Sequence, residues 1–424
     1  MALIAQILFS ILTGTALFLF GKNLLTIRRN ILIGKDAFIN DRKGERWMQV
    51  LLLAFGQKKM FRNPLVAILH LFVYVGFIVI NIELLEIIVD GITGNHRAFA
   101  PLLGSYYDLL INIFEILAAL VLIACVLFYT RRNIIKLKRF TSKDLNGWPR
   151  SDANAILITE VILMGLFLIM NATDPTTNFL ISSYLKPLFS SLNESQLAGM
   201  EHTAWWIHII GIYAFMNYLP YSKHLHIILA FPNSYYATLE PKGKMHNMQS
   251  IQNEVLYAMQ PEMAPTEAAA PEKFGARDVM DLSWKNLMDA YSCTECGRCS
   301  AACPANITGK LLSPRKIMMS TRDRLEAVGK NIDTNKLFIE DGKSLLHDYI
   351  TVEELRACTT CNACVEECPV SISPMDIILE LRRSLVMEES NAPAEWNGMF
   401  SNIENNFAPW KFSPDDRDAW TSQS

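Results

Sequence analysis

Two stretches of this sequence share one cysteine pattern and decide how the second half of the chain folds. Residues 293–304 read CTECGRCSAACP, and residues 358–369 read CTTCNACVEECP. Both have the spacing C-x2-C-x2-C-x3-C-P, and eight of the nine cysteines of the chain lie in them. Thiolates at that spacing are typical ligands of iron–sulfur clusters. The repeat therefore predicts two [4Fe–4S] clusters.

The spacing also predicts how the cysteines divide between the clusters. Three cysteines at two-residue intervals wrap the backbone around one cluster, and the fourth, displaced by the proline turn, reaches the other cluster. The first predicted cluster takes Cys293, Cys296, Cys299 and Cys368. The second takes Cys358, Cys361, Cys364 and Cys303. The ninth cysteine, Cys125, lies in an apolar run and is expected to be a small packing residue.

Zinc and disulfide bonds are the alternatives for such a set of cysteines. Zinc sites commonly use two Cys pairs at a longer separation, instead of four cysteines in a short segment that ends in proline. Disulfides are disfavoured if this part of the chain lies in the reducing cytoplasm. The pattern therefore favours iron–sulfur clusters over both.

The first 230 residues contain five apolar runs long enough to cross a bilayer, which takes about 20 residues. The predicted spans are residues 2–20, 64–88, 106–129, 154–172 and 203–230. The loops between them alternate in basic content, with ten Lys or Arg in 21–63, seven in 131–153, and one each in 89–105 and 173–202. The positive-inside bias places the N-terminus outside and the cysteine-rich part in the cytoplasm. We therefore expect a multi-pass protein of the cytoplasmic (inner) membrane.

Composition divides the chain into four predicted parts. These are a transmembrane domain (1–232), a linker in which Pro and Ala alternate with Glu (233–273), a cluster domain (274–390) and a C-terminal tail (391–424). The fold class is all-α, because strand alternation is scarce. In the cluster domain, Ser313-Pro314 and Ser373-Pro374 are good helix starts and predict helices over 315–328 and 375–388. A net charge of -3 without a basic, aromatic-rich stretch argues against nucleic acid as a partner.

Histidines within the apolar runs are candidate axial ligands of haem iron. His70 lies about 9 Å into the second span, at 1.5 Å per residue. On the fifth span, His224 and His226 match this depth and lie on opposite faces, while His208 shares the face of His226 about 27 Å away. We predict b-type haem on His70 and His226.

The acidic residues Glu115 and Glu160 lie well inside their predicted spans. Intramembrane acids are functional candidates because a carboxylate in the bilayer is costly. Both are therefore candidates for proton delivery to a quinone, and a structural pairing within the bundle is equally compatible with the sequence.

Residues 210–226, which end in PYSKHLH, resemble the end of the fifth helix in the cytochrome b (gamma) subunit of respiratory nitrate reductase. That family binds two haems between its second and fifth helices. The resemblance implies a five-helix cytochrome b-like bundle with haem ligands at His70 and His226, and makes His208 a candidate ligand of a second haem. The remaining ligand position falls at Ile80, beside Asn81, so one haem is the expectation.

Residues 284–315, with CTECGRC and the later Gly309-Lys310, are similar to the C-type iron–sulfur subunit of heterodisulfide reductase. The chain as a whole resembles membrane iron–sulfur oxidoreductases that pass electrons from electron-transfer flavoprotein to menaquinone. In those relatives a domain with two CCG motifs follows a segment like NFAPW at 406–410. This sequence contains no CCG motif, so the resemblance implies a CCG-type partner on a separate chain.

The expected function is that of an oxidoreductase subunit that relays electrons in the membrane. The route runs from a CCG-type partner, with electron-transfer flavoprotein as the expected donor, through the clusters and haem b to menaquinone. A membrane redox sensor or transporter with an iron–sulfur regulatory domain is one alternative, and a thiol/disulfide relay is another. The aromatic residues of the tail predict that it docks the partner: Trp396, Phe400, Phe407, Trp410, Phe412 and Trp420.

Overall fold

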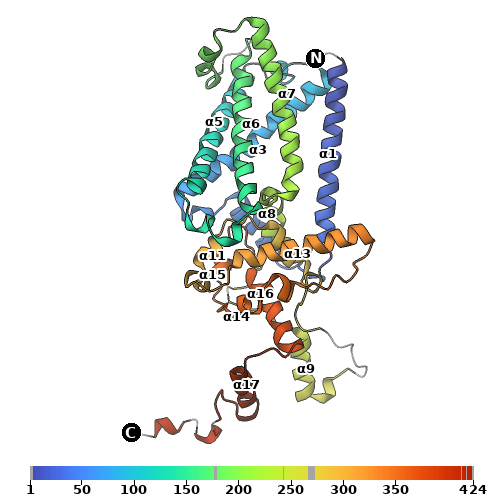
Figure 1. Ribbon diagram of the computed structural model, residues 1–424, viewed down its shortest axis with the longest axis vertical. Coiled ribbons are helices and arrows are strands. Elements are labelled where there is room, and N and C mark those ends of the chain that lie inside the picture. Colours follow the sequence, from blue (N-terminus) through green and yellow to red (C-terminus); the bar gives the residue numbers. More distant parts are fainter. Residues whose placement is uncertain are drawn as a thin grey trace.

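The computed structural model describes residues 3–175, 179–241, 243–265, 273–411, 413–416 and 418–422. Within these ranges the chain forms helices, turns and two isolated β-bridges, and no strand. Long helices stand side by side at one end of the molecule, and the short helices of the C-terminal half gather at the other end (Figure 1). The expectation of a mostly helical protein is therefore confirmed.

Four helices in the described part of the chain are long and apolar enough to cross a membrane. They are α1 (Leu3–Ile31), α3 (Pro64–Thr93), α5 (Ser105–Asn133) and α6 (Trp148–Thr173). They correspond to the first four predicted spans. Helix α1 packs on α3, α3 packs on α5, and α5 packs on α6. Because such helices suit a lipid environment, the structure supports association with a membrane.

The prediction of a continuous fifth span over 203–230 is wrong. Helix α7 (Glu194–Tyr218) packs against α6 and α1 but is not among the four helices that meet the length and composition of a span. It ends before Pro220, which lacks the N–H that a helix interior needs. Two short 3₁₀ turns, Leu219–Tyr221 and Lys223–Leu225, then lead into α8 (His226–Tyr235). The five-helix bundle is therefore supported for only four of its predicted spans.

The remaining helices are short and connect or follow the bundle. The connecting ones are α2 (Lys43–Gln49), which continues as a π-helical turn over Val50–Phe55, α4 (Ala100–Leu103) and α9 (Gln249–Met259). The C-terminal half contributes α10 (Trp284–Ser292), α11 (Arg298–Ala302), α12 (Pro304–Ile307), α13 (Pro314–Asn335), α14 (Val352–Arg356), α15 (Ala363–Glu367), α16 (Pro374–Arg383) and α17 (Ala394–Asn406).

The two predicted Ser-Pro helix starts are confirmed. Ser313 caps α13 by accepting a hydrogen bond from the backbone N–H of Lys316, and Ser373 caps α16 by accepting one from Asp376. Proline occupies the first turn of each helix, where its missing N–H leaves no bond unmade. The first helix runs longer than predicted, to Asn335, whereas the second becomes a π-helical turn after Arg383.

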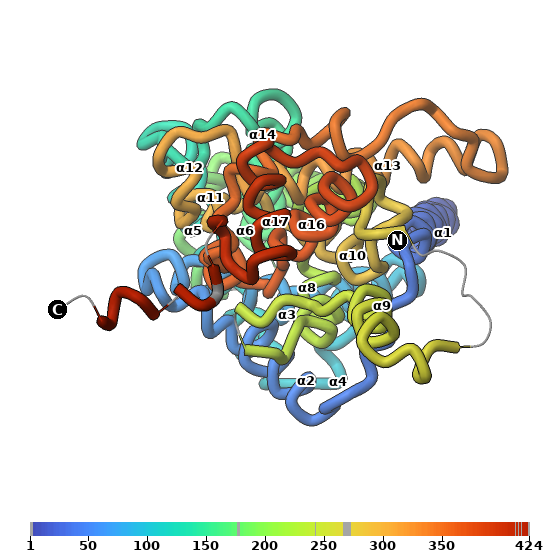
Figure 2. The backbone as a smooth tube through the Cα atoms, turned by 90° about the horizontal axis from the view of Figure 1, so that it is seen from below, coloured from blue at the N-terminus to red at the C-terminus, as the bar shows by residue number. Residues whose placement is uncertain are grey.

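The cluster domain shares one hydrophobic core with the inner end of the bundle. Ile27 and Ile31 of α1 and Leu225 pack in the same buried cluster as Leu287 and Ile317 of the C-terminal half. Viewed from below, helices α10, α11, α13 and α16 lie across the end of the bundle (Figure 2). The two halves are therefore held together by apolar packing as well as by polar contacts.

A tight backbone contact joins the end of α1 to the start of α10. Lys35 donates its N–H to the carbonyl of Leu282 at 2.8 Å, and the N–H of Trp284 returns a bond to the carbonyl of Lys35 at 3.0 Å. A Cβ added at Gly34 would lie 2.7 Å from the Leu282 carbonyl oxygen, so only glycine fits there.

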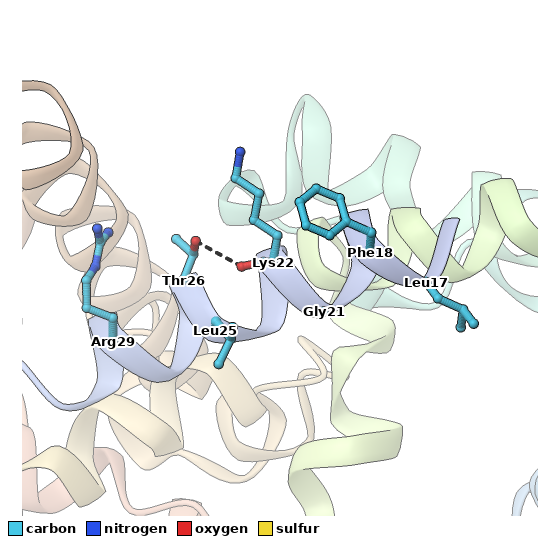
Figure 3. A pocket seen from close by; sticks show the side chains of 7 residues that line it. All are labelled: Leu17, Phe18, Gly21, Lys22, Leu25, Thr26 and Arg29. Carbon is cyan, nitrogen blue, oxygen red and sulfur yellow. Dashed lines mark hydrogen bonds between the residues drawn. The ribbon is translucent and has the colours of Figure 1, made fainter. Parts of the chain in front are cut away.

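The outer surface of α1 changes character along its length, as Figure 3 shows. Leu17 and Phe18 line one end of a shallow groove, and Lys22, Leu25 and Arg29 follow in turn toward its other end. Long basic side chains of this kind place their charge at the water interface while their stems cover apolar surface. This polarity agrees with a helix that leaves the lipid at its cluster-side end.

Replacing Arg315 should loosen the cluster domain from the bundle. The guanidinium of Arg315, 1% exposed, donates to the carboxylate of Asp144 at 2.7 and 3.0 Å. Arg315→Ala leaves this buried carboxylate unpaired, which costs about 3–5 kcal/mol of stability. Arg62→Ala is the matched control, because its ion pair with Glu366 also links the two halves but is partly exposed and contributes only about 0–1 kcal/mol. Thermal unfolding in detergent measures both, and an equal small loss for the two variants would contradict the assignment.

Candidate cofactor sites

The two cysteine stretches fold into matching loops. In the first, Cys293 follows α10, and the loop passes through left-handed positions at Glu295 (φ 53°) and Gly297 (φ 72°) before α11. In the second, Thr360 (φ 56°) and Asn362 (φ 61°) take the same places before α15. A Cβ at Gly297 would lie 2.5 Å from the Arg315 guanidinium, so the first loop also depends on glycine for space. The sequence repeat is therefore a structural repeat.

The structure brings Cys368 to the first three cysteines. Cys293, Cys296, Cys299 and Cys368 line one small cavity, which Cys364 also borders. The thiol of Cys368 interacts electrostatically with Cys296, although the two are 72 residues apart. The fourth cysteine of the second stretch thus reaches the cavity of the first, as cross-ligation requires.

The other four cysteines also meet. Cys364 interacts electrostatically with Cys358, Cys303 and Cys361, and Cys358 with Cys303 and Cys361. Cys303 therefore leaves its own stretch and approaches the second loop. All nine cysteines are free thiols, with Cys125 buried in the bundle.

Several of the cysteine thiols hold their protons strongly. A metal centre that binds them would have to displace these protons. Burial raises the pKa of Cys293 and of Cys364 to about 12, and that of Cys368 to about 11. Backbone N–H groups point at two sulfurs, from Ile372 to Cys368 Sγ at 3.3 Å and from Thr360 to Cys358 Sγ at 3.4 Å. Such donors stabilise thiolates bound to a cluster.

Among the described residues, no three His, Cys, Asp or Glu side chains converge closely enough to hold a single metal ion. A four-iron cluster takes one thiolate at each of four iron corners, so its ligands surround the cluster and need not meet at one point.

Glu295 connects the first cysteine loop to the membrane half. Its carboxylate, 3% exposed, receives Lys223 Nζ at 2.6 Å and the Arg322 guanidinium at 2.6 Å. Burial raises the pKa of Glu295, but these two cations outweigh burial and hold the pKa below its ordinary value. Sequence reasoning missed this residue, because nothing in CTEC marks its glutamate as a bridge to residues 72 positions away.

Three imidazoles meet at the cluster-side end of the bundle. The ring centroids of His224 and His226 are 5.5 Å apart, and both rings interact electrostatically with His70. The prediction that His224 and His226 lie on opposite helix faces is therefore wrong. The chain turns through two 3₁₀ segments between Tyr218 and His226, so helical periodicity does not carry across them. For the same reason the depth difference of about 27 Å between His208 and His226, which assumed one straight helix, does not apply.

His70 and His226 have the hydrogen bonds that suit metal ligands. Nδ1 of His70 lies 2.9 Å from Gln57 Oε1, and Nδ1 of His226 lies 3.0 Å from the carbonyl oxygen of Lys223. An acceptor at Nδ1 fixes the proton there and leaves Nε2 free to coordinate iron. His224 has no such partner at its buried Nδ1. The two predicted residues therefore fit an axial haem ligand pair better than His224 does.

The first cysteine loop lies near this histidine group, with Lys59 bonded to both cysteine loops. Arg298 of that loop interacts electrostatically with His70 and donates to the carbonyl of Lys59 at 3.0 Å. Lys59 in turn donates from Nζ to the carbonyl of Cys368 at 3.0 Å. Loop residues between α2 and α3 thus separate the first cysteine cavity from the imidazoles.

A second cavity, of about 90 Å³, lies within the bundle, and we name it the midplane cavity. His208 of α7 and Glu160 of α6 line it, opposite Ile80 and Asn81 of α3. His208 is the only histidine among its lining residues. Glu83 of α3 also lines this cavity and was missed by sequence reasoning, although it lies inside a predicted span, where any acid is a signal.

The second predicted acid, Glu115, is away from this cavity. Its carboxylate is fully buried and accepts hydrogen bonds from the side chain of Asn171 at 3.1 Å and from the N–H groups of Ile181 and Ser182 at 2.7 and 3.1 Å. These bonds fix the segment after α6, so the geometry assigns Glu115 the structural pairing that the sequence left open.

The C-terminal tail extends away from the rest of the molecule (Figure 1). Its helix α17 has no buried residue, and the aromatic side chains that follow are largely exposed. The exposed fractions are Trp396 41%, Phe400 42%, Phe407 76%, Trp410 75% and Trp420 74%. Phe412 lies outside the described residues.

Comparison with known proteins agrees with the cysteine geometry. Residues 292–372 match the family of the 4Fe-4S dicluster domain. The chain is 27% identical, over 99% of its length, to a probable iron-sulfur-binding oxidoreductase FadF of Bacillus subtilis, of which it covers 61%. It is also 27% identical, over 91% of its length, to an EtfAB:quinone oxidoreductase of Syntrophomonas wolfei, of which it covers 55%. No solved structure matches the chain.

Shorter matches point the same way. A probable membrane-anchored ferredoxin of Chromohalobacter salexigens is 32% identical over 37% of the chain, which covers 25% of that protein. A CoB-CoM heterodisulfide reductase subunit of Methanosarcina acetivorans is 37% identical over 27% of the chain, which covers 56% of it. The chain spans less than two thirds of each of these relatives, several of which are named oxidoreductases. The part of this chain that holds the eight paired-loop cysteines is a 4Fe-4S dicluster domain.

Proposed function

We propose that this chain is the membrane-anchored electron-transfer subunit of an oxidoreductase, which passes electrons between two [4Fe–4S] clusters and a quinone in the membrane. The observation that carries the proposal is the position of Arg298 in the first cysteine loop, which interacts electrostatically with His70 of the bundle and donates a hydrogen bond to the carbonyl of Lys59 at 3.0 Å. It brings a cluster-binding loop and a histidine group together at the surface where the two halves of the chain meet.

Each cluster takes three cysteines from one stretch and one from the other. The first is held by Cys293, Cys296, Cys299 and Cys368, and the second by Cys358, Cys361, Cys364 and Cys303. The shared cavity and the electrostatic neighbours described above support this division. Because each cluster joins both stretches, neither loop can bind its cluster alone.

His70 and His226 hold one b-type haem at the cluster-side end of the bundle. The anchored Nδ1 atoms support this pair, since each leaves Nε2 available. A haem bound there supplies one-electron exchange between the first cluster and the membrane interior. Gln57 and the Lys223 carbonyl orient the two imidazoles. His208 remains the candidate ligand of a second haem only if another group supplies the position of Ile80.

Menaquinone is the proposed partner in the membrane, and the midplane cavity is the proposed place for its ring. Glu160 lines that cavity and is positioned to exchange a proton with a bound quinone. The quinone-linked name of the Syntrophomonas wolfei relative supports this part of the proposal. The same name makes electron-transfer flavoprotein the proposed donor, through a CCG-type iron–sulfur subunit on a separate chain.

A thiol/disulfide relay is the second candidate function. It is favoured by the similarity to heterodisulfide reductase subunits over the cysteine-rich segment. A relay of that kind delivers electrons to a disulfide on a partner and needs no haem. A membrane sensor or transporter with a regulatory cluster domain likewise predicts clusters without haem.

Optical and magnetic spectra of the purified protein separate these candidates. The proposed function predicts a reduced-minus-oxidised difference spectrum of b-type haem, together with the electron paramagnetic resonance signals of two reduced [4Fe–4S] clusters. Added menaquinone analogue should reoxidise both. Cluster signals without haem, and no reoxidation by the quinone, would favour the relay or the sensor instead.

Truncating the chain at Asn391 should stop electron delivery from the physiological partner without touching the cofactors. The tail exposes aromatic side chains, which dominate binding energy at interfaces, so we propose that it docks the CCG-type subunit. We expect both clusters and haem to remain in the truncated protein, while donor-to-quinone turnover falls at least about tenfold. The matched control is Trp396→Ala with Trp410→Ala in the full chain, which removes two anchors and should weaken copurification. A truncated protein that still copurifies with its partner at full activity would contradict the docking role.

A further inference from the structure

Two polar atoms face the midplane cavity without a hydrogen-bond partner. Glu83 is 4% exposed and its Oε2 has none, and His208 is 3% exposed and its Nδ1 has none. Glu83 belongs to α3 and His208 to α7, and both residues line the cavity. Buried polar atoms are normally paired, because leaving one unpaired costs about 1–3 kcal/mol. A cavity that keeps two of them is suited to a ligand with two polar ends.

Apart from Asn81 and Glu160, the rest of the cavity wall is apolar, and it includes a partly exposed residue. Val73, Val121 and Leu163 form part of the wall, and Phe77 at its edge is 39% exposed. A flat ring that carries a carbonyl oxygen at each end fits this combination, since its faces pack on aliphatic side chains. Its isoprenoid chain would leave toward Phe77. A quinone has this chemistry.

Glu83 is also the inner end of a row of acids on α3. Glu83, Glu86 and Asp90 lie at positions i, i+3 and i+7 and therefore share one face of the helix. Each is less than 9% exposed, and Glu83 interacts electrostatically with both of the others. Glu86 accepts hydrogen bonds from the hydroxyl of Tyr107 at 3.0 Å and from the N–H of Phe99 at 2.9 Å.

This row ends at the far end of the bundle, opposite the cluster domain. Asp90 accepts the N–H groups of Arg97 and Ala98, each at 2.8 Å. The Arg97 side chain donates to Asp174 at 3.0 Å and to the Tyr107 hydroxyl at 3.1 Å. His96, whose side chain is 57% exposed, lies 3.4 Å from the same Asp174. Ionisable groups thus continue from the midplane cavity to the water at the far end.

We propose that Glu83 transfers protons between a quinone in the midplane cavity and the far side of the membrane, through Glu86 and Asp90. This inference rests on the proposed function. Reduction of the quinone takes two electrons, which arrive from the clusters, and two protons, one for each carbonyl oxygen, and yields the quinol. Glu83 gives the first proton to the nearer oxygen and is reprotonated from the row. It then gives a second proton to Nδ1 of His208, which passes that proton to the other oxygen, and the row reprotonates Glu83 again. Electrons and protons therefore enter the cavity from opposite sides of the membrane.

Besides the row itself, the charged and titratable groups that face Glu83 are Arg97 and Glu115, with Glu160 and His208 across the cavity. The Glu115 carboxylate already accepts three hydrogen bonds. No row of acidic side chains leads from Glu160 along α6 to the far end of the bundle. These differences single out Glu83 as the link.

Vesicles with a pH-sensitive dye inside test the proposal. The holoprotein is inserted into phospholipid vesicles that contain a naphthoquinone, and the molecules with the cluster domain outward are driven by titanium(III) citrate, which does not cross the membrane. We expect the lumen to become alkaline by two protons for each quinol formed. Glu83→Gln should reduce that proton uptake and quinol formation at least about tenfold while leaving cluster reduction unchanged. Glu83→Asp keeps a carboxylate and should restore part of both, whereas Glu194→Gln, at an exposed acid of the far side, should behave as wild type.

The wild-type measurement alone is decisive. Protons withdrawn from the cluster side during quinol formation would overturn the route and leave the proposed function standing. Equal lumen uptake in Glu83→Gln and wild type would overturn the role of this residue. If the wild type forms no quinol although its clusters are reduced, the proposed function itself fails.

Discussion

Cys368→Ser is expected to destroy the cluster of the first cysteine stretch, not that of its own stretch. Its sulfur lies in the cavity of Cys293, Cys296 and Cys299, and its backbone N–H neighbour Ile372 holds it there. We expect the same lost cluster signal in Cys368→Ser and Cys293→Ser, and the opposite signal lost in Cys303→Ser and Cys358→Ser. Each variant should keep about four of the eight irons that two four-iron clusters contain.

Anaerobic iron analysis and electron paramagnetic resonance of the four variants measure this directly. Electron transfer to quinone should fall to background in all four, because either loss interrupts the chain of centres. Cys125→Ser is the matched control, since this thiol is buried in the bundle away from both loops. Pairing of Cys368 with Cys358 in the same lost signal, or stoichiometric zinc in place of iron, would refute the assignment.

The second large effect concerns the haem. His70→Ala and His226→Ala are each expected to abolish the same low-spin b-type signal, because a haem held by these two residues would keep only one ligand from the protein in either variant. His224→Ala should keep the signal, although the ring of His224 lies only 5.5 Å from that of His226. The anchored Nδ1 of His226 is the physical basis for choosing between the two.

A graded variant strengthens that comparison. Gln57→Leu removes the acceptor at His70 Nδ1 and leaves the imidazole in place, so we expect haem to remain bound at lower occupancy or altered potential. Redox titration of the difference spectrum measures both. A haem that survives in His226→Ala but is lost in His224→Ala would show that the neighbouring ring is the ligand.

The cysteine sites and most of the helices could be predicted because each depends on a local rule. The spacing of Cys293 to Cys303 and its repeat from Cys358 is set by the geometry of a cluster. The first four spans follow from the length of apolar chain that a bilayer demands. Ser313 and Ser373 start helices through a bond to the third residue along. None of these needs information from distant parts of the chain.

The wrong predictions arose where the periodicity of one helix was extended across a break in that helix. The fifth span was carried through Pro220, and with it the helical register that placed His224 and His226 on opposite faces. The chain instead turns twice before His226, and the two rings lie side by side. Gln57 was out of reach for a different reason, because a left-handed backbone at this residue (φ 47°) brings its side chain to His70.

The backbone hydrogen bonds that join Lys35 to Leu282 and Trp284 have a consequence for how the chain folds during synthesis. Helix α1 leaves the ribosome before the cluster domain, which follows more than 200 residues later. The membrane half can therefore present Ile27, Ile31 and the Gly34 turn before the cysteine loops exist. The cluster domain then completes its core on a surface already inserted, instead of folding free in solution and docking afterwards. A fragment that starts at residue 273 would lack that surface and leave core residues such as Leu287 without part of their cover.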